Sequence, residues 1–295
     1  MTVSTPIRNS CDIDVKDMEY LRHGDKPLLA RVYQPRGTGP FPLVIDIHGG
    51  AWCNKDRFAD AAVDEALARS GIVVAALDFR MPPEAAYPAS VADINYAIRW
   101  FKLRAAEFKS AAGKVCLLGF SSGAHQGILA AMRPHDRRYS ALSLPSPGDP
   151  VDATVRCVVL CSPLVDPLER YHYVKRLEQD GDPQLAERVG PSHERYWGGE
   201  AAMAEGNPVL ALERGEPMPV LPPVLYASLT QDRMHPRVSL DRFVKGYRGA
   251  GGRVELEWFD DTVEDGFISG DPNTAAARAA IAKVIEFIHR QAGTA

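Results

Sequence analysis

Several features that would place a chain in a specialised class are missing from this sequence. No apolar run reaches the ~20 residues that a transmembrane helix needs. The first residues, MTVSTPIRNSCDIDVKD, lack the basic-then-apolar pattern of a secretory signal. The formal net charge of −4 gives no reason to expect nucleic acid or a membrane surface as a partner. We therefore expect a cytoplasmic protein that binds neither.

Paired cysteines are missing as well. The five cysteines are Cys11, Cys53, Cys116, Cys157 and Cys161, and no two of them form a CxxC pair. Three lie inside or beside apolar, strand-like runs. Free thiols in a reducing compartment explain this pattern better than disulfides or zinc ligands do, so no metal site is expected.

Continuous apolar runs, with helical patterns between them, organise the middle of the chain. The runs rich in β-branched residues span 43–47, 72–77, 114–118, 155–161 and 224–229. Strands that are buried on both faces have this composition. Residues 253–259 alternate instead, as in a strand nearer an edge. Apolar residues recur at helical spacing around 91–101, 240–247 and 281–288. The alternation predicts an α/β protein, a mostly parallel sheet with helices on both faces.

Two regions break this alternation. The first 40 residues hold strand candidates at 11–19 and 27–34, which predict an antiparallel edge. Residues 162–219 are rich in proline, glycine and charge, with weak periodicity, and lie between two buried strands. We interpret 162–219 as a cap-like insertion over the carboxyl edge of the sheet, where open α/β sheets bind ligands. The core is then formed by 1–161 and 220–295.

A strand-to-helix junction carries the first chemical motif. Residues 119–123 read Gly-Phe-Ser-Ser-Gly, between the apolar run KVCLL and a helical pattern. Such an elbow holds its central serine, Ser121, in a strained backbone, and the flanking glycines let neighbouring chain pass closely. Ser121 would then lie at a helix N-terminus, which favours developing negative charge.

A second motif, His48–Trp52, reads HGGAW and directly follows a buried strand. The small residues Gly49, Gly50 and Ala51 let backbone N–H groups point at an anionic oxygen. With the N–H of Ser122, the donors of Gly50 and Ala51 would hold the oxyanion of a tetrahedral intermediate. HGG alone is only a turn signal, so the combination with the elbow supplies the specificity.

Three linked motifs in this order resemble a known family. HGGAW, then LDFRMPPEAAYPASVADINYAIRW at 77–100, then GFSSGAH look like the α/β-hydrolase fold, in particular its hormone-sensitive-lipase-like and feruloyl-esterase-like carboxylesterases. The resemblance runs from about residue 27 to the end, apart from 162–205. It implies hydrolysis of a small carboxylic ester or amide by a Ser-Asp-His triad, without a cofactor.

The family's triad transfers only in part. Ser121 matches the nucleophile, and Asp232 follows the next buried strand, where the family places its acid. The family's histidine precedes Gly-Phe after the last strand, but this chain has Asp265 there. A carboxylate with an ordinary pKa near 4 is a poor base for a hydroxyl group. An Asp232/Asp265 pair could instead share a proton and do acid-base chemistry on a substrate.

Other histidines are alternatives for the base. His235, three residues after Asp232, is expected to line the site without bonding directly to Ser121. His48 is expected to order its turn, and His125 to pack its helix. His172 and His193 lie in the insertion and could reach the site from above.

Three functions therefore stay open at this point. The first is a hydrolase of small esters or amides with an atypical triad. The second is a lyase or dehydratase that uses the Asp232/Asp265 pair. The third is a ligand-binding protein that has lost catalysis. We rank the hydrolase first because the elbow and the HGGAW turn are both intact. The oligomeric state is left open, a homodimer included.

Overall fold

One sheet of eight strands forms the centre of the computed structural model, which describes residues 11–145, 151–219, 221–230, 232–259 and 274–293. The order across the sheet is β1-β2-β4-β3-β5-β6-β7-β8. The strands are β1 (Ile13–His23), β2 (Lys26–Pro35), β3 (Leu43–Ile47), β4 (Val73–Leu77), β5 (Val115–Phe120), β6 (Val158–Cys161), β7 (Val224–Leu229) and β8 (Val254–Phe259).

The strand directions confirm the predicted sheet. β1 pairs antiparallel with β2, and β2 with β4, so the first two strands form an antiparallel edge. Every neighbouring pair from β4 to β8 is parallel. β3, β4 and β5 are buried along their whole length, which explains their continuous apolar sequences. β8 is the opposite edge and is only partly buried, as its alternating sequence indicated.

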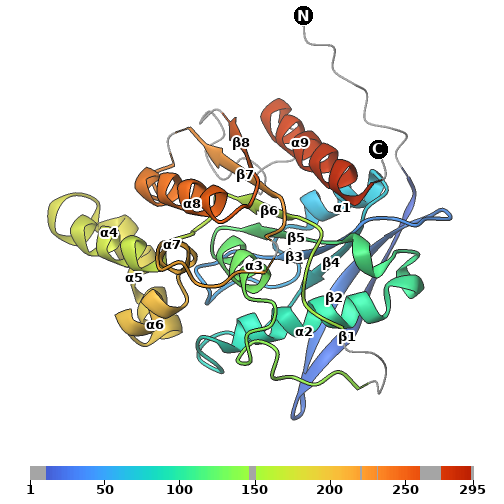
Figure 1. The fold of residues 1–295 in the computed structure, drawn as a ribbon, viewed down its shortest axis with the longest axis horizontal. Coiled ribbons are helices and arrows are strands. Elements are labelled where there is room, and N and C mark those ends of the chain that lie inside the picture. Colours follow the sequence, from blue (N-terminus) through green and yellow to red (C-terminus); the bar gives the residue numbers. More distant parts are fainter. Residues whose placement is uncertain (1–10, 146–150, 220, 231, 260–273, 294–295) are drawn as a thin grey trace, which may run out of the picture.

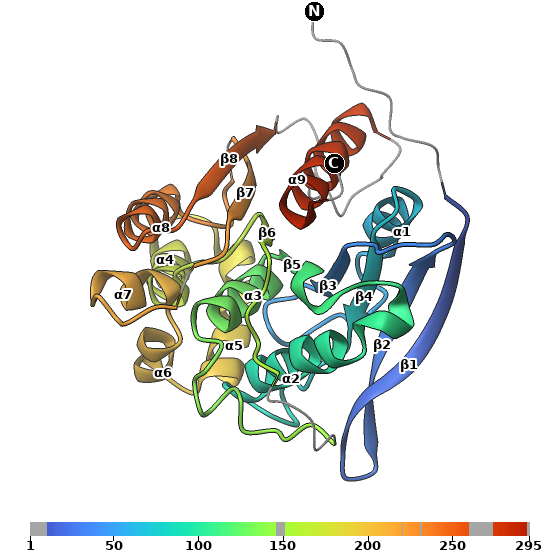
Figure 2. The same ribbon diagram turned by 45° about the vertical axis from the view of Figure 1, so that its right-hand side comes forward.

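Helices cover both faces of the sheet (Figure 1, Figure 2). α1 (Ala61–Arg69) and α9 (Ala275–Ala292) pack on one face, and α2 (Ala89–Leu103), α3 (Ser122–Met132) and α8 (Arg237–Gly249) pack on the other. Two 3-10 helices, η1 (Ala105–Phe108) and η2 (Ala112–Lys114), precede β5. The predicted helical stripes face inward, because Ile94, Ile98 and Phe101 are fully buried.

The predicted insertion between β6 and β7 folds into four helices within the described residues, and we call these helices the cap. They are α4 (Pro167–Asp180), α5 (Pro183–Trp197), α6 (Glu200–Glu205) and α7 (Pro208–Glu213). The cap lies at one end of the molecule, beside α3 and α8 (Figure 1). The cap shows weak periodicity in the sequence because many of its apolar residues pack in small clusters, such as Trp197 and Met203 with Trp52, and, of the described cap helices, only α7 joins the main core of the sheet.

Two further sequence expectations bear on the fold. Among the residues that the structure describes, no helix has the combined length and apolarity needed to cross a bilayer. All five cysteines are free thiols, and Cys116, Cys157 and Cys161 are buried, as predicted.

Candidate active site

Ser121 lies at the junction of β5 and α3 with φ +50° and ψ −113°. A positive φ is unfavourable for a residue with a side chain, so surrounding contacts must hold it. A Cβ at Gly119 would lie 2.6 Å from the Cα of Ala124, and one at Gly123 would lie 2.0 Å from the carbonyl oxygen of Ile47. Only glycine fits at these two positions, which gives the spacing of the Gly-x-Ser-x-Gly motif a steric cause.

The His48–Trp52 turn follows β3 and passes close over this elbow. A Cβ built on Gly49 would lie 3.0 Å from the carbonyl oxygen of Phe120 and 3.5 Å from the Cβ of Ser121. The turn and the serine therefore meet almost backbone to backbone, at the carboxyl ends of two adjacent parallel strands.

The same turn has a strained backbone and free donors. Gly50, Ala51 and Trp52 all have positive φ, of +104°, +50° and +62°. The N–H of Trp52 donates to the Oγ of Ser122 across 3.1 Å, which ties the turn to the first residue of α3. Within the described part of the chain, no hydrogen bond occupies the N–H groups of Gly50, Ala51 or Ser122. These three N–H groups can donate hydrogen bonds to an anionic oxygen.

A buried chain of hydrogen bonds joins the turn to the cap. The indole Nε1–H of Trp52 donates to Nδ1 of His125 at 3.2 Å. The Nε2–H of His125 in turn donates to the carbonyl of Gly206, after α6, at 2.8 Å. Burial lowers the pKa of His125 to about 4, so the ring is neutral with its proton on Nε2. Tyr196 of α5 stacks on Trp52 with ring centroids 5.3 Å apart. His125 therefore packs its helix, as predicted, and also links the turn to the cap.

The imidazole of His235 reaches the serine, contrary to the sequence expectation. Its Nε2 lies 3.3 Å from the Oγ of Ser121, and its Nδ1 lies 2.8 Å from Oδ2 of Asp232. The expectation was wrong because the backbone turns back at once after Asp232. The Oδ1 of this carboxylate accepts the N–H of Met234 at 2.8 Å and of His235 at 3.0 Å.

The electrostatics of this pair suit an anionic acid beside an imidazole. Burial alone would raise the pKa of Asp232. The charge and hydrogen bond of His235, with the two backbone N–H donors, outweigh burial and place the pKa below its usual range. Only 12% of the His235 side chain and 10% of the Asp232 side chain are exposed, so little water screens the pair.

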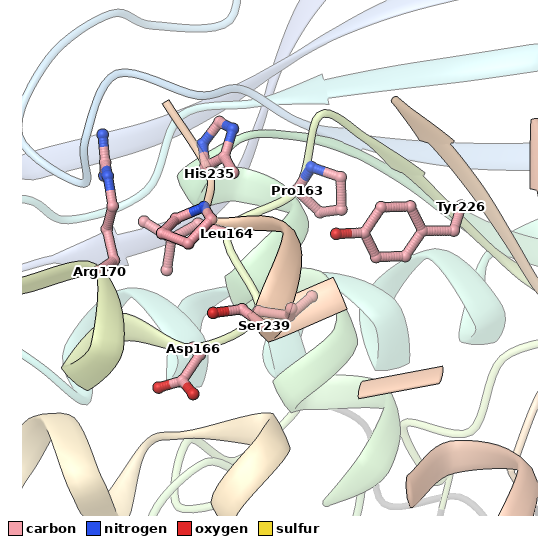
Figure 3. A pocket seen from close by; sticks show the side chains of 9 residues that line it. Pro163, Leu164, Asp166, Arg170, Tyr226, His235 and Ser239 are labelled. Atoms are coloured by element: carbon pink, nitrogen blue, oxygen red, sulfur yellow. The ribbon is translucent and has the colours of Figure 1, made fainter. Parts of the chain in front are cut away.

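A small pocket adjoins His235 on the side of the β6–α4 connection (Figure 3). Its lining residues are Pro163, Leu164, Val165, Asp166, Arg170, Tyr226, His235, Pro236 and Ser239. Figure 3 shows the Tyr226 ring with its hydroxyl toward this group of residues. Burial and the nearby Asp232 carboxylate raise the pKa of Tyr226, so its hydroxyl stays protonated. The N–H of Leu164 donates to the carbonyl of Ser121 at 3.2 Å, which brings the pocket wall against this serine.

The other candidate histidines have other partners. His48 is buried and stacks on Phe79 with centroids 4.4 Å apart, consistent with an ordering role in its turn. His172 pairs with Glu200 on the cap at 3.1 Å. His193 is fully buried, and burial lowers its pKa to about 3. As far as the structure describes their contacts, none of these rings bonds to Ser121.

Asp265 lies outside the described residues, so its predicted role is untested. Within the described residues, sequence reasoning missed Leu164, Trp52 and Tyr226 as neighbours of the site. Trp52 carried a signal, because it ends the HGGAW motif. Nothing in the sequence marked Leu164 or Tyr226, because each lies in or beside an apolar strand and is typical of a core residue.

Esterases are found among the curated proteins of similar sequence. Esterase LipC of Mycobacterium tuberculosis is 33% identical over 138 residues, covering 45% of this chain and 34% of that protein. Carboxylic ester hydrolase LipN of the same organism is 34% identical over 113 residues, covering 37% and 30%. The chain thus aligns with only about a third of the length of these curated relatives.

The whole fold matches solved esterases. A Pyrobaculum calidifontis esterase superposes with a TM-score of 0.75 at 23% identity, covering 97% of this chain and 88% of that one. Esterase LipW from Mycobacterium marinum gives 0.73 at 21% identity, covering 95% and 82%. The fold is therefore that of the α/β-hydrolases. Residues 31–181, more than half of the chain, match the family model BD-FAE, and the chain belongs to this family of feruloyl-esterase-like α/β-hydrolases.

Proposed function

We propose that the protein hydrolyses small carboxylic esters, with Ser121 as nucleophile, His235 as general base and Asp232 as the acid that orients it. The observation that carries the proposal is the continuous chain from Ser121 Oγ to His235 Nε2 and from His235 Nδ1 to Asp232 Oδ2. The curated relatives named as esterases support ester substrates.

The steps follow from which atoms face one another. The Nδ1–H of His235 donates a hydrogen bond to Asp232, which keeps the proton on Nδ1, so the lone pair of His235 Nε2 points to the Ser121 hydroxyl. The serine oxygen attacks the ester carbonyl carbon while Nε2 takes its proton. Nε2 then gives that proton to the departing alcohol, which leaves an acyl-serine. Water attacks the acyl-serine and loses a proton to Nε2, and Nε2 returns this proton to Ser121 Oγ as the Oγ–acyl bond breaks and the carboxylic acid leaves.

The anionic oxygen of each tetrahedral intermediate is proposed to bind the N–H groups of Gly50, Ala51 and Ser122. These donors are unoccupied within the described residues, and the turn that carries two of them lies against Ser121. Fixed donors of this kind contribute about 10²–10³ in rate.

The proposed base comes from the loop after β7, whereas the family pattern places its histidine after the last strand. Asp232 and His235 therefore belong to one short loop, which we call the base loop (residues 232–236). Both oxygens of the Asp232 carboxylate accept hydrogen bonds, Oδ2 from His235 and Oδ1 from two backbone N–H groups. This favours a hydrolase over chemistry by an Asp232/Asp265 pair.

Steady-state cleavage of p-nitrophenyl acetate by four proteins tests the proposal. Wild type should turn over, and Ser121→Ala and His235→Ala should each lose at least ~10³-fold in kcat. Asp265→Asn should stay within about threefold of wild type, because the proposed base does not need it. A fluorophosphonate probe should label wild type but not Ser121→Ala.

The opposite pattern would overturn the assignment. If Asp265→Asn abolished turnover while His235→Ala kept it, the base would lie after β8. If the wild type neither cleaved esters nor reacted with the probe, hydrolysis itself would be the wrong function.

A further inference from the structure

The conformation of the base loop is set by one of its own side chains, that of Asp232. Asp232 receives both backbone N–H groups and the imidazole of His235, so acid, backbone and base form one small unit. These bonds fix the ring relative to Asp232. They do not fix this unit relative to Ser121, because Ser121 follows β5 and the base loop follows β7.

The contacts that hold the unit from outside come from the α4–α5 hairpin of the cap. The hydroxyl of Tyr173, on α4, donates to the backbone carbonyl of Arg233 at 3.0 Å. The side chain of Met234 packs against an apolar cluster of the same two helices, formed by Val174, Leu177, Ala186 and Val189. Both residues between the acid and the base are thus held by the cap.

The geometry at Ser121 makes this attachment important for catalysis. The 3.3 Å between Ser121 Oγ and His235 Nε2 is already long for an O–H···N hydrogen bond. A displacement of about 1 Å at a reacting group can cost roughly 10²-fold in rate. A base loop that lost its outer contact would therefore keep its Asp232–His235 pair and still miss the serine.

We propose that Tyr173 is a positioning residue for the general base, holding the base loop at the distance from which His235 reaches Ser121. The inference rests on the proposed function, because it needs His235 to be the base. The inference gives the cap a role in the chemical step, because α4 of the cap then holds the base loop and with it the imidazole of His235.

The hairpin offers a matched control for the experiment. Tyr171, on the same helix, donates its hydroxyl to Glu194 of α5 at 3.2 Å and leaves the base loop untouched. Tyr173→Phe and Tyr171→Phe each remove one hydroxyl group that makes a hydrogen bond at the surface of the α4–α5 hairpin. Tyr173→Phe should lower kcat for p-nitrophenyl acetate by about three- to tenfold, with KM unchanged. Tyr171→Phe should change neither constant.

A background without the base separates positioning from a general structural effect. In His235→Ala, adding Tyr173→Phe should leave the residual activity unchanged, because no imidazole remains to be placed. An equal further loss in that background would overturn the inference, as would equal behaviour of the two tyrosine variants. Full activity in His235→Ala alone would overturn the proposed function instead.

Discussion

The two sides of Ser121 are held by different means. On one side, the His48–Trp52 turn lies against the elbow backbone to backbone, and Trp52 is 1% exposed. On the other side, the base loop carries Arg233 with 81% of its side chain exposed, and it is shaped by the carboxylate of Asp232. The parallel sheet builds the anion-binding side directly. The base side depends on one acidic residue and on the cap.

This difference predicts how each side fails. On the sheet side, a new atom has no room, so an added side chain must push the backbone of the turn away from Ser121. On the base side, a substitution that keeps or reduces the size of a side chain is expected to leave the fold intact and to lose the orientation of the imidazole. Overpacking on the sheet side should therefore lower both stability and activity, whereas damage on the base side should lower mainly kcat.

The largest effect is expected at Asp232. Asp232→Asn puts an amide where Nδ1–H of His235 needs an acceptor and allows the wrong tautomer to face Ser121. We expect kcat for p-nitrophenyl acetate to fall by ~10³–10⁴-fold while the thermal midpoint changes little. Circular dichroism provides the control for folding. A loss below tenfold would show that the Asp232–His235 bond does not set the tautomer.

On the sheet side, Gly123→Ala is the sharpest disruption. Its new Cβ would lie 2.0 Å from the carbonyl oxygen of Ile47 and 2.4 Å from that of His48. We expect at least ~10²-fold loss of kcat/KM and a destabilisation above ~2 kcal/mol, measured by urea unfolding.

Gly127→Ala, one turn further along α3, is its matched control. The Cβ there would meet the end of the flexible Ile47 side chain at 3.1 Å, and alanine favours the helix by about 1 kcal/mol. It should retain activity and near-wild-type stability. Equal damage by both variants would mean that the helix, and not the elbow, is sensitive.

The same contrast explains what could be predicted from the sequence. Runs such as 43–47 and 224–229 predicted strands with the correct bounds, because burial on both faces favours apolar residues at nearly every position. The elbow and turn followed from glycines whose steric cause is local. The hydrogen bond between Ser121 and His235 could not be predicted from the sequence. It depends on the loop conformation that the hydrogen bonds to the Asp232 side chain impose. The family pattern directed attention to Asp265, which lies outside the described residues.

A buried carboxyl group at the start of α1 gives a prediction about stability. Asp60, just before α1, is 3% exposed, and neither of its oxygens has a hydrogen-bond partner among the described residues. Burial raises its pKa to about 6. Between pH 4 and 6 the unfolded chain loses this proton while the folded chain keeps it, so stability falls as the pH rises.

At pH 7 the unfavourable contribution of Asp60 is about 3 kcal/mol, because a pKa that is higher by one in the folded protein corresponds to ~1.4 kcal/mol. Asp60→Asn should remove about 2 kcal/mol of the decline in unfolding free energy between pH 4.5 and pH 7, measured by urea titration at both values, since about 1 kcal/mol of the effect already falls below pH 4.5. An unchanged pH slope would show that Asp60 ionises normally in the folded protein.

A smaller effect is expected from Trp52→Phe. The ring can still stack on Tyr196, but the donor to Nδ1 of His125 is lost, and a buried acceptor is left unpaired. We expect kcat to fall about tenfold with a modest loss of stability, because the strained turn loses one tie to the cap. In the double variant Trp52→Phe/His125→Phe, the losses should be less than additive. Additive losses would mean that the two residues act independently.

The smallest effect should come from Arg233→Ala, which removes an exposed ion pair between the base loop and the cap. The guanidinium of Arg233 lies 3.6 Å from Asp182, with side chains 81% and 35% exposed, so water and salt screen the pair. Such pairs contribute about 0–1 kcal/mol, and the backbone carbonyl that Tyr173 binds is still present in Arg233→Ala. We therefore expect less than a twofold change in kcat and equal sensitivity to 1 M NaCl in variant and wild type. A tenfold loss would show that the exposed ion pair, and not the Tyr173 hydroxyl or the packing of Met234, holds the base loop. The contrast between a base fixed by the Tyr173 hydrogen bond and the packing of Met234 on the cap and one fixed by surface charge depends on this measurement.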